Sequence, residues 1–179
     1  MKKISLLLIC ILIVTGCKNI SNTPTAKVEN FMEKYQTMDS VVLNQLDVIL
    51  ENRNELTDDQ KSEYKSLMEK QYQNLSYTIK DENIDEDNAN IVVEIETYDY
   101  INALNKSEEY FTNNQKKFKK EDGTINIKKY WDYKIEEMIK VDDRITNEIV
   151  FVLHKEKGKW ILDDISDIDI EKIHGLYRG

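Results

Sequence analysis

The sequence predicts an α+β fold in which N-terminal helices pack on a curved, mainly antiparallel sheet of about four strands, giving a cone-like shape. Apolar residues recur at helical spacing in two long stretches, and each stretch is followed by one in which apolar and polar residues alternate, as in a strand. Runs of one element followed by runs of the other favour α+β over a strictly alternating α/β fold. The 179 residues show no internal repeat, so we expect one domain over residues 27–179.

Three helices are expected in the first half of the domain. The first has one apolar stripe, formed by Val28, Phe31, Met32 and Tyr35. Thr23 or Thr25 is its candidate N-cap, and Asp39-Ser40 is expected to end it. A second apolar stripe runs from Val41 to Leu50. The segment Thr57 to Gln60 matches a capping box, so the third helix begins behind it.

Two pairs of strands are expected. Ser76–Asp81 is a short strand candidate, followed by an acidic turn over Asp81–Asn88 and a clear strand over Ala89–Tyr100. In that strand one face carries Ile91, Val93 and Ile95. The second pair, Thr146–Lys155 and Lys159–Ile165, is joined by a turn at Gly158.

Between the strand pairs, the spacing predicts one helix over Asn102–Lys119 and another over Ile127–Ile139, with a turn at Asp122-Gly123. The apolar residues of the C-terminal tail, Ile168 to Ile173, predict a short final helix.

The N-terminus has the parts of a bacterial lipoprotein export signal. Lys2 and Lys3 precede an apolar run from Ile4 to Val14, which is too short to span a bilayer. Val14-Thr15-Gly16-Cys17 resembles the lipobox of bacterial lipoprotein precursors. The resemblance implies cleavage between Gly16 and Cys17 and a diacylglyceryl group on Cys17, with or without an added N-acyl chain such as palmitate. Residues 1–16 are then the signal peptide, and residues 17–26 are the lipidated cysteine and a polar tether.

Charge and cysteine usage limit the possible partners. Loss of Lys2 and Lys3 lowers the basic count from 25 to 23 against 34 acids, a net charge of −11. An acidic chain is repelled by anionic lipids and by nucleic acid, so the lipid is expected to be the sole membrane anchor and no nucleic-acid partner is expected. Cys10 lies in the removed segment, which leaves no thiol for the domain. The expected location is the extracytoplasmic face of the cell membrane.

A second resemblance concerns the domain. N-terminal helices lead into a hairpin, and a late strand ends in Gly158-Lys159-Trp160-Ile161-Leu162-Asp163. The pattern over 26–165 resembles the nuclear-transport-factor-two-like, or cystatin-like, class, which implies helices on a curved sheet around a pocket. The segments LTDDQKSEYKSLMEKQYQNL and DDIS…KIHGLY also resemble uncharacterised clostridial-type lipoproteins. That likeness implies fold and location only.

No catalytic or metal motif stands out. The two histidines, His154 and His174, are expected to be exposed, and no HExxH or cysteine pair suits zinc. The acidic turn fails the calcium-loop pattern, because Glu86 stands where glycine is needed and Val92 where a bidentate glutamate is needed. The GxSxG motif and glycine-rich phosphate motifs are absent. We therefore expect a protein without cofactor or metal that is not an enzyme.

Three function hypotheses follow. In the first, the domain is a lipid-anchored binding or interaction protein, which takes an unknown protein or a small apolar ligand. Its cone pocket would be lined by Tyr98, Tyr130 and Trp131, although packing in the core is the preferred explanation of these rings. In the second, it is a small isomerase- or dehydratase-like enzyme with Asp99 or His154 as the acid–base group. In the third, it is a structural or signalling accessory protein of the cell envelope.

Overall fold

The α+β class is confirmed by the computed structural model, which describes residues 22–179. Three helices come first, α1 (Pro24–Gln36), α2 (Ser40–Glu51) and α3 (Asp58–Gln73), followed by the strands β1 (Ser76–Asp85) and β2 (Asn88–Tyr98). Then come α4 (Tyr100–Asn113), the 3₁₀ helix η1 (Gln115–Phe118) and α5 (Ile127–Ile139). The chain ends with β3 (Arg144–Glu156), β4 (Lys159–Leu162) and α6 (Asp167–His174).

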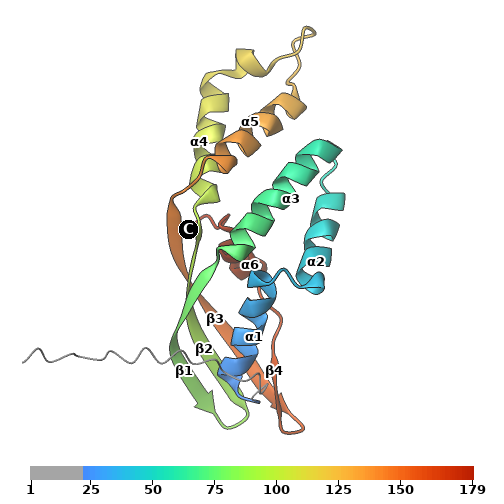
Figure 1. Cartoon of the computed structure of the whole chain (residues 1–179). Helices are drawn as coiled ribbons and strands as arrows, with labels where there is room; N and C mark the ends of the chain where they lie inside the picture. Colours follow the sequence, from blue (N-terminus) through green and yellow to red (C-terminus); the bar gives the residue numbers. More distant parts are fainter. Residues whose placement is uncertain (1–21) are drawn as a thin grey trace, which may run out of the picture.

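The four strands form one antiparallel sheet in the order β1-β2-β3-β4, which is open, with β1 and β4 at its edges. Helices α1 and α6 cover one face of this sheet (Figure 1). The alternation in β2 is confirmed, because Ile91, Val93 and Ile95 are fully buried beneath the helices. From β3, Phe151 meets Phe31 of α1 edge to face at 5.4 Å. The core therefore lies between the sheet and the helices on that one face.

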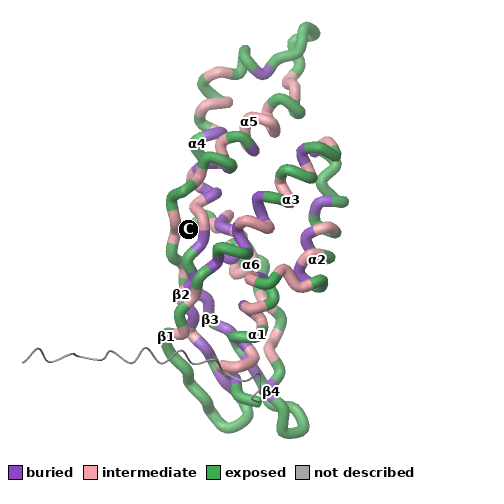
Figure 2. Tube along the Cα trace, viewed as in Figure 1, coloured by how far each residue is buried: buried purple, intermediate pink, exposed green. Residues whose placement is uncertain are grey.

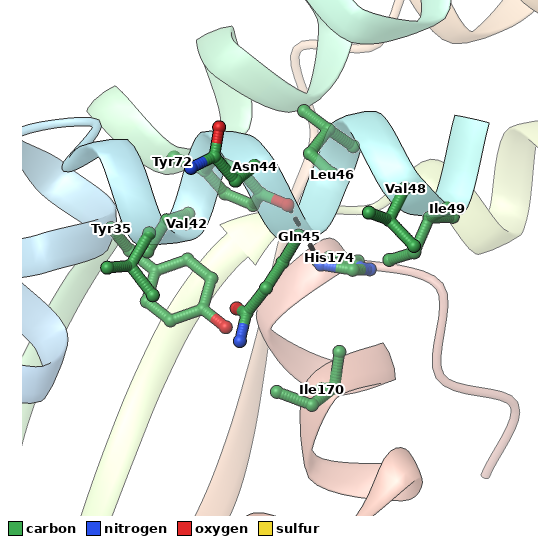
Figure 3. Close-up of a pocket in the computed structure, with 11 residues that line it drawn as sticks. Tyr35, Val42, Asn44, Gln45, Leu46, Val48, Ile49, Tyr72, Ile170 and His174 are labelled. Atoms are coloured by element: carbon green, nitrogen blue, oxygen red, sulfur yellow. Dashed lines mark hydrogen bonds between the residues drawn. The ribbon is translucent and has the colours of Figure 1, made fainter. Parts of the chain in front are cut away.

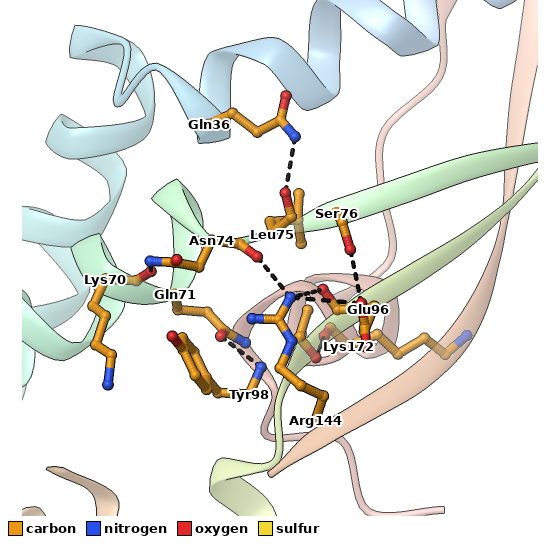
Figure 4. A network of polar contacts seen from close by, with 11 residues as sticks. Gln36, Lys70, Gln71, Asn74, Leu75, Ser76, Glu96, Tyr98, Arg144 and Lys172 are labelled. Carbon is orange, nitrogen blue, oxygen red and sulfur yellow. Dashed lines mark hydrogen bonds and ion pairs between the residues drawn. The ribbon is translucent and has the colours of Figure 1, made fainter. Parts of the chain in front are cut away.

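A polar network ties α3, β2, β3 and α6 together where the sheet ends (Figure 4). The guanidinium of Arg144 donates to the carbonyl oxygens of Asn74 at 2.6 Å and Glu96 at 3.0 Å. The buried amide of Gln71 accepts from the backbone N–H of Tyr98 at 2.8 Å and donates to the carbonyl of Ile173 at 3.3 Å. These contacts hold α6 against the end of α3.

Gly175 ends α6 in the left-handed conformation, with a φ of 70°. A Cβ atom there would lie 2.1 Å from the carbonyl oxygen of Tyr98 and 2.6 Å from the amide nitrogen of Gln71. The Gly175 carbonyl also accepts a hydrogen bond from the backbone of Ile101. Only glycine combines this backbone conformation with so close an approach.

Helices α4 and α5, with η1 between them, form a hairpin that extends beyond the sheet (Figure 1). We call residues 100–139 the arm and residues 113–130 its tip. Most of the tip is exposed or half-buried (Figure 2), but Phe118 is buried there. It is surrounded by four rings, those of Tyr110, Phe111, Tyr130 and Tyr133, at centroid distances of 5.3–6.3 Å. This aromatic cluster is the apolar core of the tip.

Several element boundaries differ from the sequence predictions. The first strand continues to Asp85, so most of the expected acidic turn is strand. The last residue pair of the β1–β2 ladder is Asp85–Asn88. Pairing with β2 satisfies the backbone hydrogen bonds of this polar segment, while its side chains face solvent. The expected helix over 102–119 begins at Tyr100 and ends at Asn113, where the Asn114 amide donates to the Tyr110 carbonyl. The last strand ends at Leu162 instead of Ile165.

The first helix begins within residues 17–26, which the sequence predicts to be a polar tether. Helix α1 begins at Pro24, and the Thr23 hydroxyl caps it by accepting from the N–H of Ala26. Asn22 is held at the β3–β4 turn, since its amide donates to the Gly158 carbonyl and accepts from the N–H of Trp160. The export signal, the cleavage site between Gly16 and Cys17 and the rest of the tether lie outside the described residues.

Candidate binding site

An apolar groove of about 540 Å³ lies between α2 and α6 (Figure 3). We call it the α2–α6 groove. None of the residues that line it is acidic or is a lysine or arginine. The walls come mainly from α2, through its valines, Leu46 and Ile49, and from Ile170 of α6. The groove is therefore an uncharged surface of a size suited to a small ligand or a short peptide segment.

Three apolar side chains of α2 stay exposed at this groove. Val41, Val48 and Ile49 are 53 %, 57 % and 41 % exposed. Helix α2 packs on α1 and α3 through Val42, Leu46 and Leu50, which are buried. Its apolar residues thus extend beyond the stripe that one packed face needs, and the surplus faces the groove.

Polar groups at the groove come from the amides of Asn44 and Gln45 and from Tyr35, Tyr72 and His174. The hydroxyl of Tyr72 and Nε2 of His174 are hydrogen-bonded at 2.9 Å. The ring of Tyr35 packs edge to face on that of Tyr72 at 5.1 Å. Within residues 22–179, neither the Tyr35 hydroxyl nor Nδ1 of His174 has a hydrogen-bond partner, yet neither atom is sealed from solvent. Both are available to a ligand.

Burial sets the charge state of these groups. It lowers the pKa of His174 to about 4, so the imidazole is neutral at pH 7. It raises the pKa of Tyr35 to about 12 and that of Tyr72 further, so both hydroxyls stay protonated. At neutral pH the groove offers hydrogen bonds without formal charge.

The prediction that both histidines are exposed is wrong for His174. It lies at the end of α6, where the turn at Gly175 directs the chain back towards β2 and places the ring against α2 and Tyr72. His154 is exposed on the open face of the sheet and is paired with Asp163. It is not among the residues that line the groove.

The three aromatic residues predicted for a cone pocket do not line the groove. Tyr98 packs on Tyr100 at the end of β2, beneath Lys70 and Arg144. Tyr130 stacks on Phe111 at 4.3 Å in the arm, and Trp131 is half-buried next to it. The ammonium of Lys134 lies over both of these rings, at 4.5 and 4.7 Å. The fold thus brings Tyr130 and Trp131 together and leaves Tyr98 apart.

Asp99 lines a separate polar cleft of about 310 Å³ with residues of α4, α5 and the following turn. Its carboxylate caps α4 by accepting from the N–H of Asn102 at 3.1 Å. In residues 22–179 no three histidine, cysteine or acidic side chains converge closely enough to hold a metal ion. Over the same range, no helix has both the length and the apolar character to cross a bilayer.

Sequence reasoning missed the groove because it treated Val41 to Leu50 as a packing stripe. One pattern could have indicated the groove: α2 carries apolar residues around most of its circumference, although polar segments flank it. No pattern pointed to His174, whose surroundings come from residues about 100 positions away.

No protein-family model matches the chain, and no curated protein and no solved structure matches it either.

Proposed function

We propose that this protein is a lipid-anchored, extracytoplasmic binding protein without catalytic activity, whose site is the α2–α6 groove. Its ligand would be uncharged and mainly apolar, with one hydrogen-bonding group. The observation that carries the proposal is the groove itself, an uncharged and mainly apolar surface. Its hydrogen-bonding groups come from Tyr35, His174 and the amides of Asn44 and Gln45. Most ligand sites combine predominantly apolar walls with a few polar groups that fix orientation.

The lining favours a neutral ligand over a charged one. No ammonium, guanidinium or carboxylate lies among the lining residues, and His174 is neutral at pH 7. A charged group placed there would lose hydration without gaining an ionic partner. The apolar part of the ligand would cover Val41, Val48 and Ile49, and its polar group would meet Nδ1 of His174 or the Tyr35 hydroxyl.

The groove is tested with an uncharged solvatochromic dye, Nile red, added to the full chain in a mild detergent below its critical micelle concentration. We expect a blue-shifted emission that saturates. Val48→Asp should weaken binding at least tenfold, because it places a carboxylate in the apolar wall. Val150→Asp is the matched control, since Val150 is 48 % exposed on the open sheet face. Equal weakening by both substitutions would contradict the groove as the site.

The anchor is tested separately with Cys17→Ala. We expect this variant to leave the membrane fraction, because the thioether that carries the acyl chains cannot form and two chains are needed for stable anchoring. A variant that still sediments with membranes would refute the lipid anchor. That result would not affect the proposal for the α2–α6 groove, because dye binding does not depend on the lipid.

A partner protein in place of a small ligand is the other form of this hypothesis. It would bind by placing apolar side chains of its own in the α2–α6 groove. Affinity purification from solubilised membranes with the wild type and Val48→Asp distinguishes the two. One partner that is recovered with the wild type and lost with Val48→Asp would favour this form.

A further inference from the structure

The tip of the arm carries a charge opposite to that of the rest of the protein. Residues 113–130 contain six lysines and two acidic residues, a formal charge of +4, whereas the whole chain carries −9. The lysines are 116, 117, 119, 120, 128 and 129, and all six are exposed. A basic group this concentrated on an acidic protein creates a local positive potential.

None of these six lysines forms an ion pair within the described part of the chain, and the one electrostatic contact with an acid is that of Lys120 with Asp122. Lysines elsewhere are commonly paired, as Lys65 is with Asp47 and Lys172 with Asp169. The side chains of Lys116, Lys119, Lys120, Lys128 and Lys129 form no ion pair among residues 22–179. Asp122, one of the two acids of the tip, instead accepts from the backbone and hydroxyl of Thr124 at 2.8 and 2.6 Å. With six lysines against two acids, the tip therefore keeps a net positive charge.

A cleft at the tip collects three of these lysines. It has a volume of about 660 Å³ and is lined by Lys116, Lys117 and Lys119 together with Thr112, Gln115 and two asparagines. No acidic side chain lines it. All of its charged groups are hydrogen-bond donors, and its side-chain amides have N–H groups as well, whereas the Thr112 hydroxyl donates to the Glu108 carbonyl at 2.8 Å.

The aromatic cluster holds the segment that carries these lysines in place. Lys117 donates to the Tyr110 hydroxyl at 2.7 Å and lies over the same ring at 5.0 Å. Tyr110 in turn packs on Phe118 and Tyr133. The turn that carries Lys119 and Lys120 is closed by hydrogen bonds to residues 124–126. The lysines therefore project from an ordered support.

We propose that the tip of the arm is a binding site for a linear polyanion, a polymer with repeated phosphate groups, through Lys116, Lys119, Lys120, Lys128 and Lys129. The charges are spread over a surface, which suits several anionic groups along one polymer better than a single ion. Ammonium groups bind phosphate as point charges and require no single geometry. The tip lies at the opposite end of the molecule from the start of α1 (Figure 1), so a chain anchored before residue 22 would direct it away from its own membrane.

The test measures binding of fluorescein-labelled polyphosphate to the full chain in neutral detergent, by fluorescence anisotropy at 50 and 200 mM salt. We expect binding at 50 mM that weakens at least tenfold at 200 mM, because neutralisation of several phosphates releases counterions. K116Q/K119Q/K120Q should weaken binding at least tenfold and lower the salt slope by about 0.7 for each lysine removed. The circular dichroism spectrum of this variant should match that of the wild type, since Lys117 and the aromatic cluster are retained.

The matched control is K34Q/K157Q/K159Q, which removes the same charge from exposed lysines outside the tip. It should bind polyphosphate within about twofold of the wild type. Equal loss in both variants would overturn the proposal, because attraction would then follow net charge alone. It would also be overturned if the wild type bound vesicles with 30 % phosphatidylglycerol but not polyphosphate, since the partner would then be a membrane.

Discussion

The α2–α6 groove and the tip of the arm are both unpartnered surfaces, but their chemistry and their attachment differ. The groove has no lysine, arginine or carboxylate in its lining, whereas the tip carries six exposed lysines. The wall formed by α6 is fastened to the sheet through Gln71 and Gly175, whereas the tip depends on one small aromatic cluster. The fold thus separates an uncharged apolar surface that is part of the main core from a basic surface with a core of its own.

The largest effect is expected at the junction that fastens α6. Gly175→Ala should lower the free energy of unfolding by about 4 kcal/mol, from the strain of a left-handed alanine and the clash with the Tyr98 carbonyl. Urea denaturation measures it. Gly158→Ala is the control, because its φ is 78° but nothing lies within 4 Å of the added Cβ, so about 1–2 kcal/mol is expected. Equal losses at the two glycines would show that α6 is not fastened by this close approach.

Phe118→Ala tests whether the tip has a core of its own. The substitution should remove about 3 kcal/mol, because it opens a cavity among four rings. Hydrogen exchange should show lost protection at the end of α4 and the start of α5, with β2 and β3 still protected. An even loss of protection across the sheet would mean that tip and sheet unfold as one unit.

The groove should make stability depend on pH through His174. Its pKa is lowered from 6.5 to about 4 by burial, so between these values the unfolded chain takes up a proton that the folded chain does not. Stability should therefore fall as the pH drops from about 6.5 to 4, by about 2 kcal/mol after allowance for partial exposure. Arg53, Asp167 and Glu171 line the adjoining cleft and contribute to the background.

Comparing the pH dependence of stability of His174→Gln with that of the wild type isolates this contribution, because the carboxylates titrate alike in both proteins. Urea midpoints at pH 7 and 4.5 should differ less in the variant than in the wild type. An identical pH dependence would mean that His174 does not stay neutral in the fold.

The smallest effect is expected from Lys129→Glu. Lys128 and Lys129 lie in the first turn of α5, where the helix dipole disfavours positive charge and where the chain has no acidic residue. The variant should gain about 0.3–1 kcal/mol in thermal or urea unfolding and bind polyphosphate more weakly. Opposite changes in stability and binding would indicate that the lysines serve recognition and not folding. A loss of stability would contradict this account of the tip.

The elements of the fold could be predicted from local sequence patterns, and the site could not. The capping box at Thr57 and Gln60 and the alternation of Ile91, Val93 and Ile95 specify their elements through neighbours a few residues apart. The continuation of β1 to Asp85 could not be foreseen, because it depends on pairing with β2 and not on its own polar residues. His174 became part of a groove only through Tyr72, 102 positions away.

Asn22 has a mechanical consequence. Its side chain holds residue 22 to the β3–β4 turn through Gly158 and Trp160. Tension applied through the chain before residue 22 would therefore load these two hydrogen bonds first. That turn lies at the opposite end of the molecule from the tip of the arm (Figure 1). Only after Asn22 releases would force reach α1, so the tip is shielded from pulling at the N-terminus.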